Sequence, residues 1–130
     1  MIEVYIDGAS SGNPGPSGAG IFIKGNGKVE EYAIPLGTMD NHEAEFTALV
    51  KALEICREKQ FRIVSVRTDS KIVSDSMEKQ FVKRRELKPY LKSALAITGG
   101  FDLFFIKWIP GRQNKQADRL AKEAIRKNEE

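Results

Sequence analysis

The sequence has little of several residue types that carry chemistry in many proteins. It contains one cysteine, Cys56, one histidine, His42, and one tryptophan. A single cysteine cannot form an internal disulfide, and no Cys/His set exists for a zinc ion. Because Cys56 falls within a helical pattern, we expect it to be a buried structural thiol. One unpaired cysteine also agrees with a reducing compartment, so we expect a cytoplasmic protein.

Long apolar runs are also missing. No stretch approaches the roughly 20 apolar residues that span a bilayer. The N-terminus, MIEVYIDG, lacks a basic region followed by an apolar core, so we expect no secretion signal. Hydrophobic residues make up 41% of the chain and charged residues 30%, which is typical of a globular protein and not of a disordered one. We expect one domain over residues 1–130 and a monomer with no obligate protein partner.

The excess of positive charge is small, at +3, but it is concentrated locally. Eleven cations fall in two segments, namely Lys79, Lys83, Arg84, Arg85, Lys88 and Lys92 in the first and Lys115, Arg119, Lys122, Arg126 and Lys127 in the second. Each segment alone is consistent with a solvated helix face. Two such segments in one small chain favour a polyanionic partner such as nucleic acid.

Hydrophobic periodicity and turn residues predict an α/β chain. The expected strands cover residues 2–7, 19–24, 28–36, 62–68 and 102–109, and the expected helices cover 42–58, 70–78, 83–97 and 114–127. The first three strands would form an antiparallel meander, after which strands and helices alternate. We therefore expect a five-stranded mixed sheet, with three antiparallel strands and then two parallel ones, flanked by helices.

A stretch rich in glycine and proline, Asp7 to Gly20, separates the first two expected strands. It reads DGASSGNPGPSGAG, and this density of Gly and Pro predicts a tight, backbone-dominated turn. An acid fixed at a strand end beside exposed backbone N–H groups suits metal and phosphate chemistry. An ordinary Gly-rich hairpin with a capping Asp is the alternative.

Four carboxylates come from four different elements. Asp7 and Asp69 each end an expected strand, and parallel neighbours would bring both to the same sheet edge. Glu45 and Asp118 lie at the edge of the apolar stripe of their helices, where an uncompensated charge is costly. Crowded carboxylates raise one another's pKa, whereas a divalent cation keeps them ionised. Oxygen-only ligation suits Mg²⁺ or Mn²⁺.

Five motifs carry a more specific signal when they are taken together. They are Asp7-Gly8 with Gly12-Asn13-Pro14-Gly15, Asn41-x-x-Ala44-Glu45, Thr68-Asp69-Ser70, Trp108-Ile109-Pro110-Gly111, and Asn114-x-x-Ala117-Asp118-x-Leu120-Ala121. In this order they resemble the type I ribonuclease H family across nearly the whole chain. The resemblance implies a ribonuclease H-like fold and an endoribonuclease that hydrolyses the RNA strand of RNA/DNA hybrids, leaving 5′-phosphate and 3′-hydroxyl ends.

The same resemblance implies roles for individual residues. The catalytic residues would be the metal ligands Asp7, Glu45, Asp69 and Asp118, which would hold two Mg²⁺ ions, with Mn²⁺ able to substitute. Asn41, Glu45 and the backbone around Gly8 would meet the 2′-hydroxyl of the RNA strand, and Asn13 would contact a phosphate of the DNA strand. Turn and helix-cap chemistry is the alternative role for Asn13 and Asn41.

Two positions depart from the family pattern. Arg112 stands where many members have a loop histidine, which is similar to the shorter archaeal and plant-like branch. Its guanidinium would neutralise the scissile phosphate but is a poor proton shuttle, and a plain surface arginine is the alternative. We expect His42 to start or bond the helix and not to replace that histidine. Asp40 stands where members often carry threonine, and Lys71 is a candidate to offset its charge and to contact nucleic acid.

The basic segment over residues 79–92 lacks the exposed tryptophan that some family members carry there, and we expect Trp108 to lie in the core. Hybrid binding is therefore expected to be modest and salt-sensitive. Two other functions stay open: a weakly active or inactive nucleic-acid-binding module on the same fold, and a nuclease that also cleaves double-stranded RNA.

Overall fold

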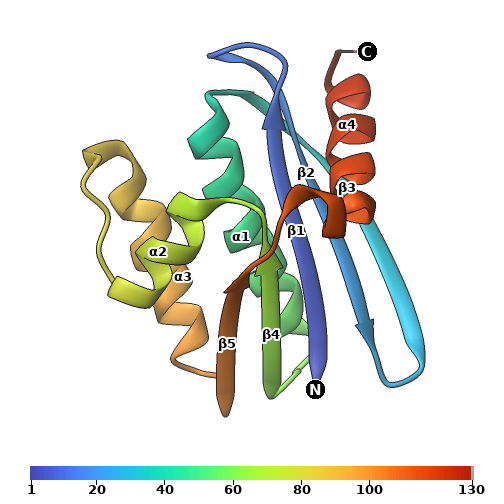
Figure 1. Ribbon diagram of the computed structural model, residues 1–130, viewed down its shortest axis with the longest axis vertical. Coiled ribbons are helices and arrows are strands. Elements are labelled where there is room, and N and C mark those ends of the chain that lie inside the picture. Colours follow the sequence, from blue (N-terminus) through green and yellow to red (C-terminus); the bar gives the residue numbers. More distant parts are fainter. Residues whose placement is uncertain (130) are drawn as a thin grey trace.

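The computed structural model describes residues 1–129, which form one five-stranded sheet with helices on both faces (Figure 1). The strands are β1 (Ile2–Ser10), β2 (Gly15–Gly25), β3 (Lys28–Met39), β4 (Ile63–Thr68) and β5 (Leu103–Trp108). The helices are α1 (Asn41–Glu58), α2 (Lys71–Lys79), α3 (Lys88–Thr98) and α4 (Lys115–Glu129), with short 3₁₀ turns η1 (Arg85–Leu87) and η2 (Gly111–Gln113). Within residues 1–129, no helix is both long and apolar enough to cross a membrane.

The strand order β3-β2-β1-β4-β5 confirms the predicted mixed sheet. Strands β1, β2 and β3 form an antiparallel meander, and β4 lies parallel to β1. Helix α1 makes the crossover between β3 and β4, and β5 continues the parallel half beside β4. The central β1 thus has β2 on one side and β4 on the other, as Figure 1 shows.

The hydrophobic core lies between the sheet and helices α1, α2 and α3. Even-numbered side chains of β1, namely Ile2, Val4 and Ile6, are buried there. They meet the fully buried α1 residues Phe46, Leu49 and Leu53. The lone Cys56 is buried in the same core, and burial raises its pKa to about 12, so it is the structural thiol expected.

Helix α4 packs on the opposite face, over β1, β2 and β3. Two glycines of β2 let it approach closely. A Cβ on Gly20 would lie 2.0 Å from the carbonyl oxygen of Ala117, and one on Gly18 would lie 2.6 Å from that of Ala121. In Figure 1, α4 covers the upper part of this face and leaves the lower part of the strands open.

The glycine-rich stretch is mostly strand, which corrects the expectation of a long turn. Strand β1 runs on through Ser10, which pairs with Ser17 of β2, so only residues 11–14 connect the two strands. Asp7 therefore lies within β1 and not at its end. Glycine favours turns locally. In this fold, however, its missing side chain lets helices pack on both faces of the sheet, and this packing keeps the stretch in strands.

The remaining boundaries differ by a few residues. The largest difference is α3, which begins at Lys88 and not at residue 83. Pro89 stands at the first or second position of this helix, where its missing N–H costs nothing, and the short turn η1 precedes it. Helix α1 starts as expected, because Asp40 and Glu43 form a reciprocal capping box at its N-terminus.

Candidate active site

The four carboxylates meet at the carboxyl end of the parallel strand pair. Asp7 comes from β1, Asp69 directly follows β4, Glu45 lies on α1, and Asp118 lies on α4. The pairing of Ile6 with Thr68 brings Asp7 and Asp69 to adjacent positions. Because β1 alternates, Asp7 lies on the face that α4 covers, and Gly8 lies on the face that α1 covers. The predicted convergence of the four acids is therefore present in the fold.

Asp7 is the most perturbed acid of the chain. Burial is the largest cause and, with the neighbouring acids, raises its pKa from 3.8 to about 8. The acids that contribute are Asp69, Asp118 and Glu45, in decreasing order. Without a cation the cluster therefore retains a proton at neutral pH.

Glu45 is oriented by a neighbour on α2. The hydroxyl of Ser70 donates to Oε2 of Glu45 at 2.5 Å, and the same hydroxyl caps α2 by accepting from the backbone N–H of Val73 at 3.3 Å. Nδ1 of His42 lies 3.4 Å from Oε2 of Glu45. His42 thus stands in the first turn of α1 and contacts the acid, in keeping with the hydrogen-bonding role expected for it.

The carboxyl of Asp69 is held by Asn114, directly before α4. Burial raises the pKa of its carboxyl, and a hydrogen bond from Asn114 partly offsets the shift. Nδ2 of Asn114 also donates to the backbone oxygen of Ile6 at 2.8 Å, so this one amide joins the start of α4 to β1 and to Asp69. Asn114 is buried, and its Oδ1 has no hydrogen-bond partner within the described residues.

Trp108 is not a core residue, which corrects the expectation. Its side chain is 43% exposed because it ends β5, the edge strand of the sheet. The indole N–H donates to the backbone oxygen of Asp69 at 3.1 Å, and Nζ of Lys71 lies 5.6 Å from the ring centroid. The exposed ring therefore sits beside the acidic cluster.

The donor chemistry of the cluster fits a hard divalent cation. All four side chains offer carboxylate oxygens, and a cation would offset both the burial and the repulsion that raise the pKa of Asp7. Asp118 also bonds Nζ of Lys122 at 3.0 Å through its Oδ2. Within residues 1–129, no three of the acids stand in a closed ligand arrangement.

The two asparagines predicted to meet nucleic acid lie against each other. The backbone N–H of Asn41, the first residue of α1, donates to Oδ1 of Asn13 at 3.1 Å. This bond ties the β1–β2 turn to the N-terminus of α1, and both side chains border one surface pocket that also reaches Glu45. Both the structural and the binding role thus stay possible for these residues at this position.

Gly8 has a packing role that the sequence did not reveal. A Cβ at this position would lie 2.1 Å from the carbonyl oxygen of Ala44 and 2.5 Å from the backbone nitrogen of Glu45. No side chain fits in that space without moving α1. Gly8 therefore sets the distance between β1 and the helix that carries Glu45.

The charge of Asp40 is offset, but by Arg84 and not by Lys71. The guanidinium of Arg84 bonds Oδ2 of Asp40 and also lies 2.9 Å from Glu86. This bond is the main reason why the pKa of Asp40 falls to about 2. Lys71 instead lies over the ring of Trp108. The two partners are 44 residues apart, so spacing in the sequence could not reveal the pair.

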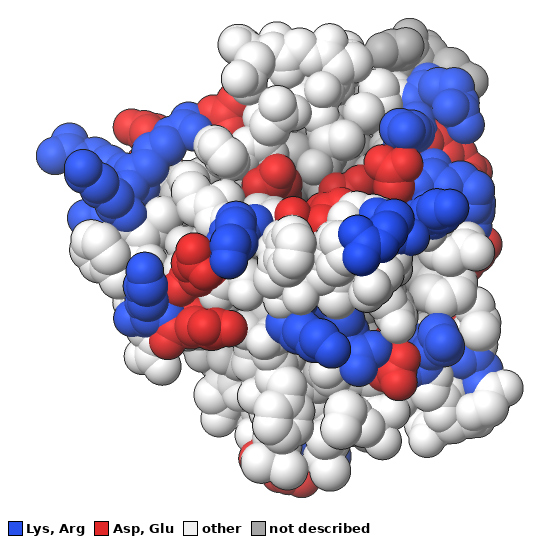
Figure 2. All heavy atoms as spheres, viewed as in Figure 1, with Lys and Arg blue, Asp and Glu red and all other residues white. Residues whose placement is uncertain are grey.

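Arg112 lies on η2, between β5 and α4, and is exposed. Its guanidinium has no ion-pair partner in the part of the chain that the structure describes, so its charge is available. Figure 2 shows Asp and Glu side chains gathered between the end of β4 and α4, with Lys and Arg on both sides. An acidic centre framed by cations suits a metal-dependent reaction on a polyanion.

Three residues at the site were missed as functional residues. Ser70 and Asn114 orient Glu45 and Asp69, and Arg84 compensates Asp40. Ser70 and Asn114 do stand in the motifs of the sequence, directly after Asp69 and four residues before Asp118, which was the available signal. For Arg84 there was none.

The chain is similar in sequence and in structure to several known proteins. Residues 5–124 match a family described as reverse transcriptase-like. The putative hydrolase EbsB of Enterococcus faecalis is 40% identical over 98% of this chain and 96% of its own length. Ribonuclease HI of Halobacterium salinarum is 34% identical over 95% of this chain and 64% of its length. The crystal structure of LC11-RNase H1, isolated from compost, in complex with an RNA/DNA hybrid matches with TM-score 0.91 and 31% identity, covering both chains fully.

Proposed function

The chain belongs to the ribonuclease H family, and from that premise we propose that it is an endoribonuclease that hydrolyses the RNA strand of RNA/DNA hybrids. The observation that carries this proposal is the meeting of four acids from four elements, where burial and then the charges of the three neighbouring acids raise the pKa of Asp7 to about 8. Structural cores avoid such repulsion, whereas a site for divalent cations requires it.

Asp7, Glu45, Asp69 and Asp118 are the residues that would hold the metal, as two Mg²⁺ ions for which Mn²⁺ can substitute. Bound cations supply activation of water and stabilisation of charge on the leaving oxygen at the phosphate. The chain contributes the positions of these ligands. Ser70 and Asn114 fix two of them, and burial of Asp7 among carboxyl groups favours a cation over a proton once one is available.

Substrate contacts follow from the surroundings of α1. Asn13 and Asn41 lie next to each other at the helix N-terminus, where backbone N–H groups and a positive dipole attract phosphate. We propose that Asn13 meets the DNA strand. Asn41, Glu45 and the backbone at Gly8 would meet the 2′-hydroxyl that distinguishes RNA. Lys71, beside Trp108, is close enough to the acids to contact the same duplex.

Arg112 is proposed to neutralise the phosphate that is cleaved. Its guanidinium is exposed and unpaired among residues 1–129, and it is carried by a 3₁₀ turn next to Asp69. A guanidinium keeps its proton at all working pH values, so Arg112 binds and orients the phosphate and moves no proton. We also propose that the protein acts as a monomer in the cytoplasm.

The test is a side-by-side cleavage assay on three labelled duplexes of one sequence: RNA/DNA hybrid, double-stranded RNA and double-stranded DNA. With Mg²⁺, the proposal expects cleavage of the RNA strand of the hybrid, with 5′-phosphate and 3′-hydroxyl ends. A faster reaction on double-stranded RNA would move the assignment to a nuclease of that type. Binding of the hybrid without any cleavage in Mg²⁺ or Mn²⁺ would favour an inactive binding module and contradict the proposal.

A further inference from the structure

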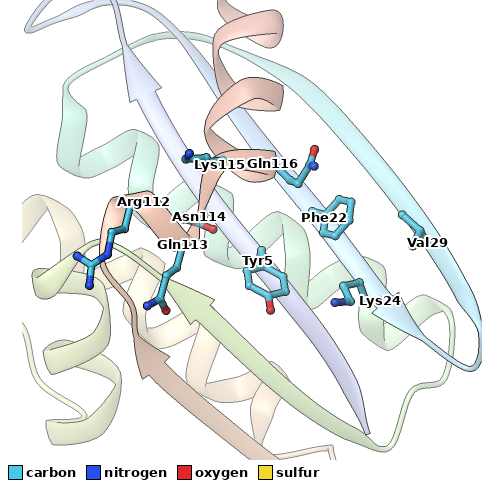
Figure 3. Close-up of a pocket in the computed structure, with 9 residues that line it drawn as sticks. All are labelled: Tyr5, Phe22, Lys24, Val29, Arg112, Gln113, Asn114, Lys115 and Gln116. Carbon is cyan, nitrogen blue, oxygen red and sulfur yellow. The ribbon is translucent and has the colours of Figure 1, made fainter.

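The face of the sheet below α4 contains a cavity outside the acidic cluster. It has a volume of about 460 Å³, within the range of small-ligand sites, and is lined by β1, β2, β3 and the start of α4. Figure 3 shows its walls: the rings of Tyr5 and Phe22 lie on the strands, with Lys24 further along β2, and Arg112 and Lys115 stand at the upper rim.

Aromatic rings form the floor of this cavity. Tyr5 and Phe22 are cross-strand neighbours, and their ring centroids lie 6.0 Å apart in an edge-to-face arrangement. Neither ring is buried, because α4 ends its cover of the sheet above them. Val29 of β3, at the side of the cavity, is 58% exposed. Both rings are partly exposed, and Arg67 lies over that of Tyr5, with its guanidinium carbon 5.5 Å from the ring centroid. Partly exposed aromatic rings on a sheet are a surface on which unpaired nucleobases stack.

Cations border the rings. Lys24, Arg112 and Lys115 have no ion-pair partner within residues 1–129. No acid is among the nine residues that line the cavity, and on the same face Glu3 pairs with Arg67 at 2.8 Å and Glu31 pairs with Arg119 at 2.6 Å. The cavity therefore carries a net positive charge, which selects an anionic occupant.

The cavity continues the candidate active site. Arg112 and Asn114 belong to both: they line the cavity, Asn114 bonds the carboxyl of Asp69, and a Cβ on Gly111 would lie 3.6 Å from Oδ2 of Asp69. Oδ1 of buried Asn114 is a further unpartnered acceptor in this wall. An anionic chain that passes the acids thus has a direct path onto the rings.

We propose that this surface binds the single-stranded part of the RNA strand where it leaves the hybrid, with bases stacked on Tyr5 and Phe22 and phosphates paired with Lys24, Arg112 and Lys115. The proposal rests on the proposed function, because it assumes that the RNA strand passes the acids. The DNA strand is assigned to Asn13, which bonds the first residue of α1, and α1 packs on the other face of the sheet from this cavity. A rigid duplex cannot turn onto the sheet face, whereas a flexible unpaired strand can.

The test compares the affinity of two hybrids in EDTA, where no cleavage occurs, by fluorescence anisotropy. One hybrid is blunt, and the other carries a single-stranded RNA extension, made in separate versions at each end. For the wild-type protein we expect one of the extensions to tighten binding by about fivefold to tenfold, which corresponds to about 1–1.4 kcal/mol, the lower end of what stacking of one base contributes.

Two variants and a matched control locate the effect. Phe22→Leu keeps apolar bulk but removes the ring, and Lys24→Gln removes one charge without touching the packing. Each is expected to reduce the gain from the extension to less than about twofold, with blunt-hybrid affinity unchanged. Lys28→Gln, an exposed lysine of the same hairpin outside this cavity, should keep the full gain. Thermal unfolding confirms that each variant is folded.

Equal affinity of the wild type for blunt and extended hybrids would overturn the proposal, as would a full gain in both variants. Tighter binding that is seen only with an extension of the DNA strand would also overturn it. The same holds if an acidic peptide displaces the bound hybrid while an RNA extension gives no gain in affinity. Cleavage of the blunt hybrid in Mg²⁺ is measured separately. If the blunt hybrid is not cleaved, the proposed function fails, whatever the extension does.

Discussion

Replacing Asp7 by asparagine should stabilise the metal-free protein. Burial and three neighbouring acids raise the pKa of Asp7 to about 8, so its ionised form is disfavoured in the folded state. A raised pKa means that the folded state keeps a proton that the unfolded state releases above its ordinary pKa of about 3.9. The part of the folding stability that depends on this proton is therefore fully present below about pH 4, and it is lost as the pH rises toward 8.

The size of the effect follows from the shift. One pKa unit corresponds to about 1.4 kcal/mol, so the full cost at pH 7 would be about 4 kcal/mol. Relaxation of the cluster reduces this value, and we expect Asp7→Asn to raise the free energy of unfolding by about 2–4 kcal/mol at pH 7 in EDTA. The gain should shrink toward zero near pH 4, where wild-type Asp7 is protonated in both states.

Urea unfolding of both proteins at pH 4, 5.5 and 7 in EDTA measures this difference. Asp102→Asn is the matched control, because Arg62 lowers the pKa of this exposed acid and its replacement should give no gain. Added Mg²⁺ should stabilise the wild type and narrow the gap, since a cation bound only by the folded state adds stability. A variant less stable than wild type at pH 7, or a gain that is independent of pH, would refute the reasoning.

Three further substitutions test individual contacts. Gly8→Ala places a methyl group against the backbone of α1, so we expect a loss of about 3 kcal/mol or more in urea unfolding, and wild-type stability would show that α1 moves freely. Arg84→Gln removes the partner of partly exposed Asp40, and we expect a loss of about 1 kcal/mol at pH 7 that disappears between about pH 4 and pH 2; a loss that persists at pH 2 would contradict the pairing. Ser70→Ala removes both a helix cap and the hydrogen bond to Glu45, so stability should fall by about 1 kcal/mol and the cleavage rate should fall too; Ser70→Thr should restore both.

The order and type of the elements followed from periodicity and turn residues, and the mixed sheet was correct. The predicted turn in the glycine-rich stretch was too long, because glycine locally favours turns. In this fold Gly18 and Gly20 are strand residues that admit α4, and Gly8 admits α1. The reason lies in helices that come from distant parts of the chain, which local sequence cannot reveal.

In the candidate site, too, local features could be predicted from the sequence, whereas contacts between distant residues could not. The acids were predictable because each follows an apolar run that predicts a strand or lies on the edge of the apolar stripe of a helix, although Asp7 proved to lie within β1 and not at its end. The residues that orient or compensate the acidic side chains could not be predicted. Asp40 pairs with Arg84, which is 44 residues away in the sequence, and the prediction that Lys71 offsets its charge was wrong. Trp108 was expected in the core, but its place at the end of an edge strand leaves it exposed.

The most direct test of the central claim is cleavage of a labelled RNA/DNA hybrid in Mg²⁺ by the wild type, Asp69→Asn and the control Asp102→Asn. The account predicts that the wild type and Asp102→Asn cleave the RNA strand alike, whereas Asp69→Asn loses the reaction by at least about two orders of magnitude while it still folds. Undiminished cleavage by Asp69→Asn would remove the acidic cluster from the mechanism and contradict the account.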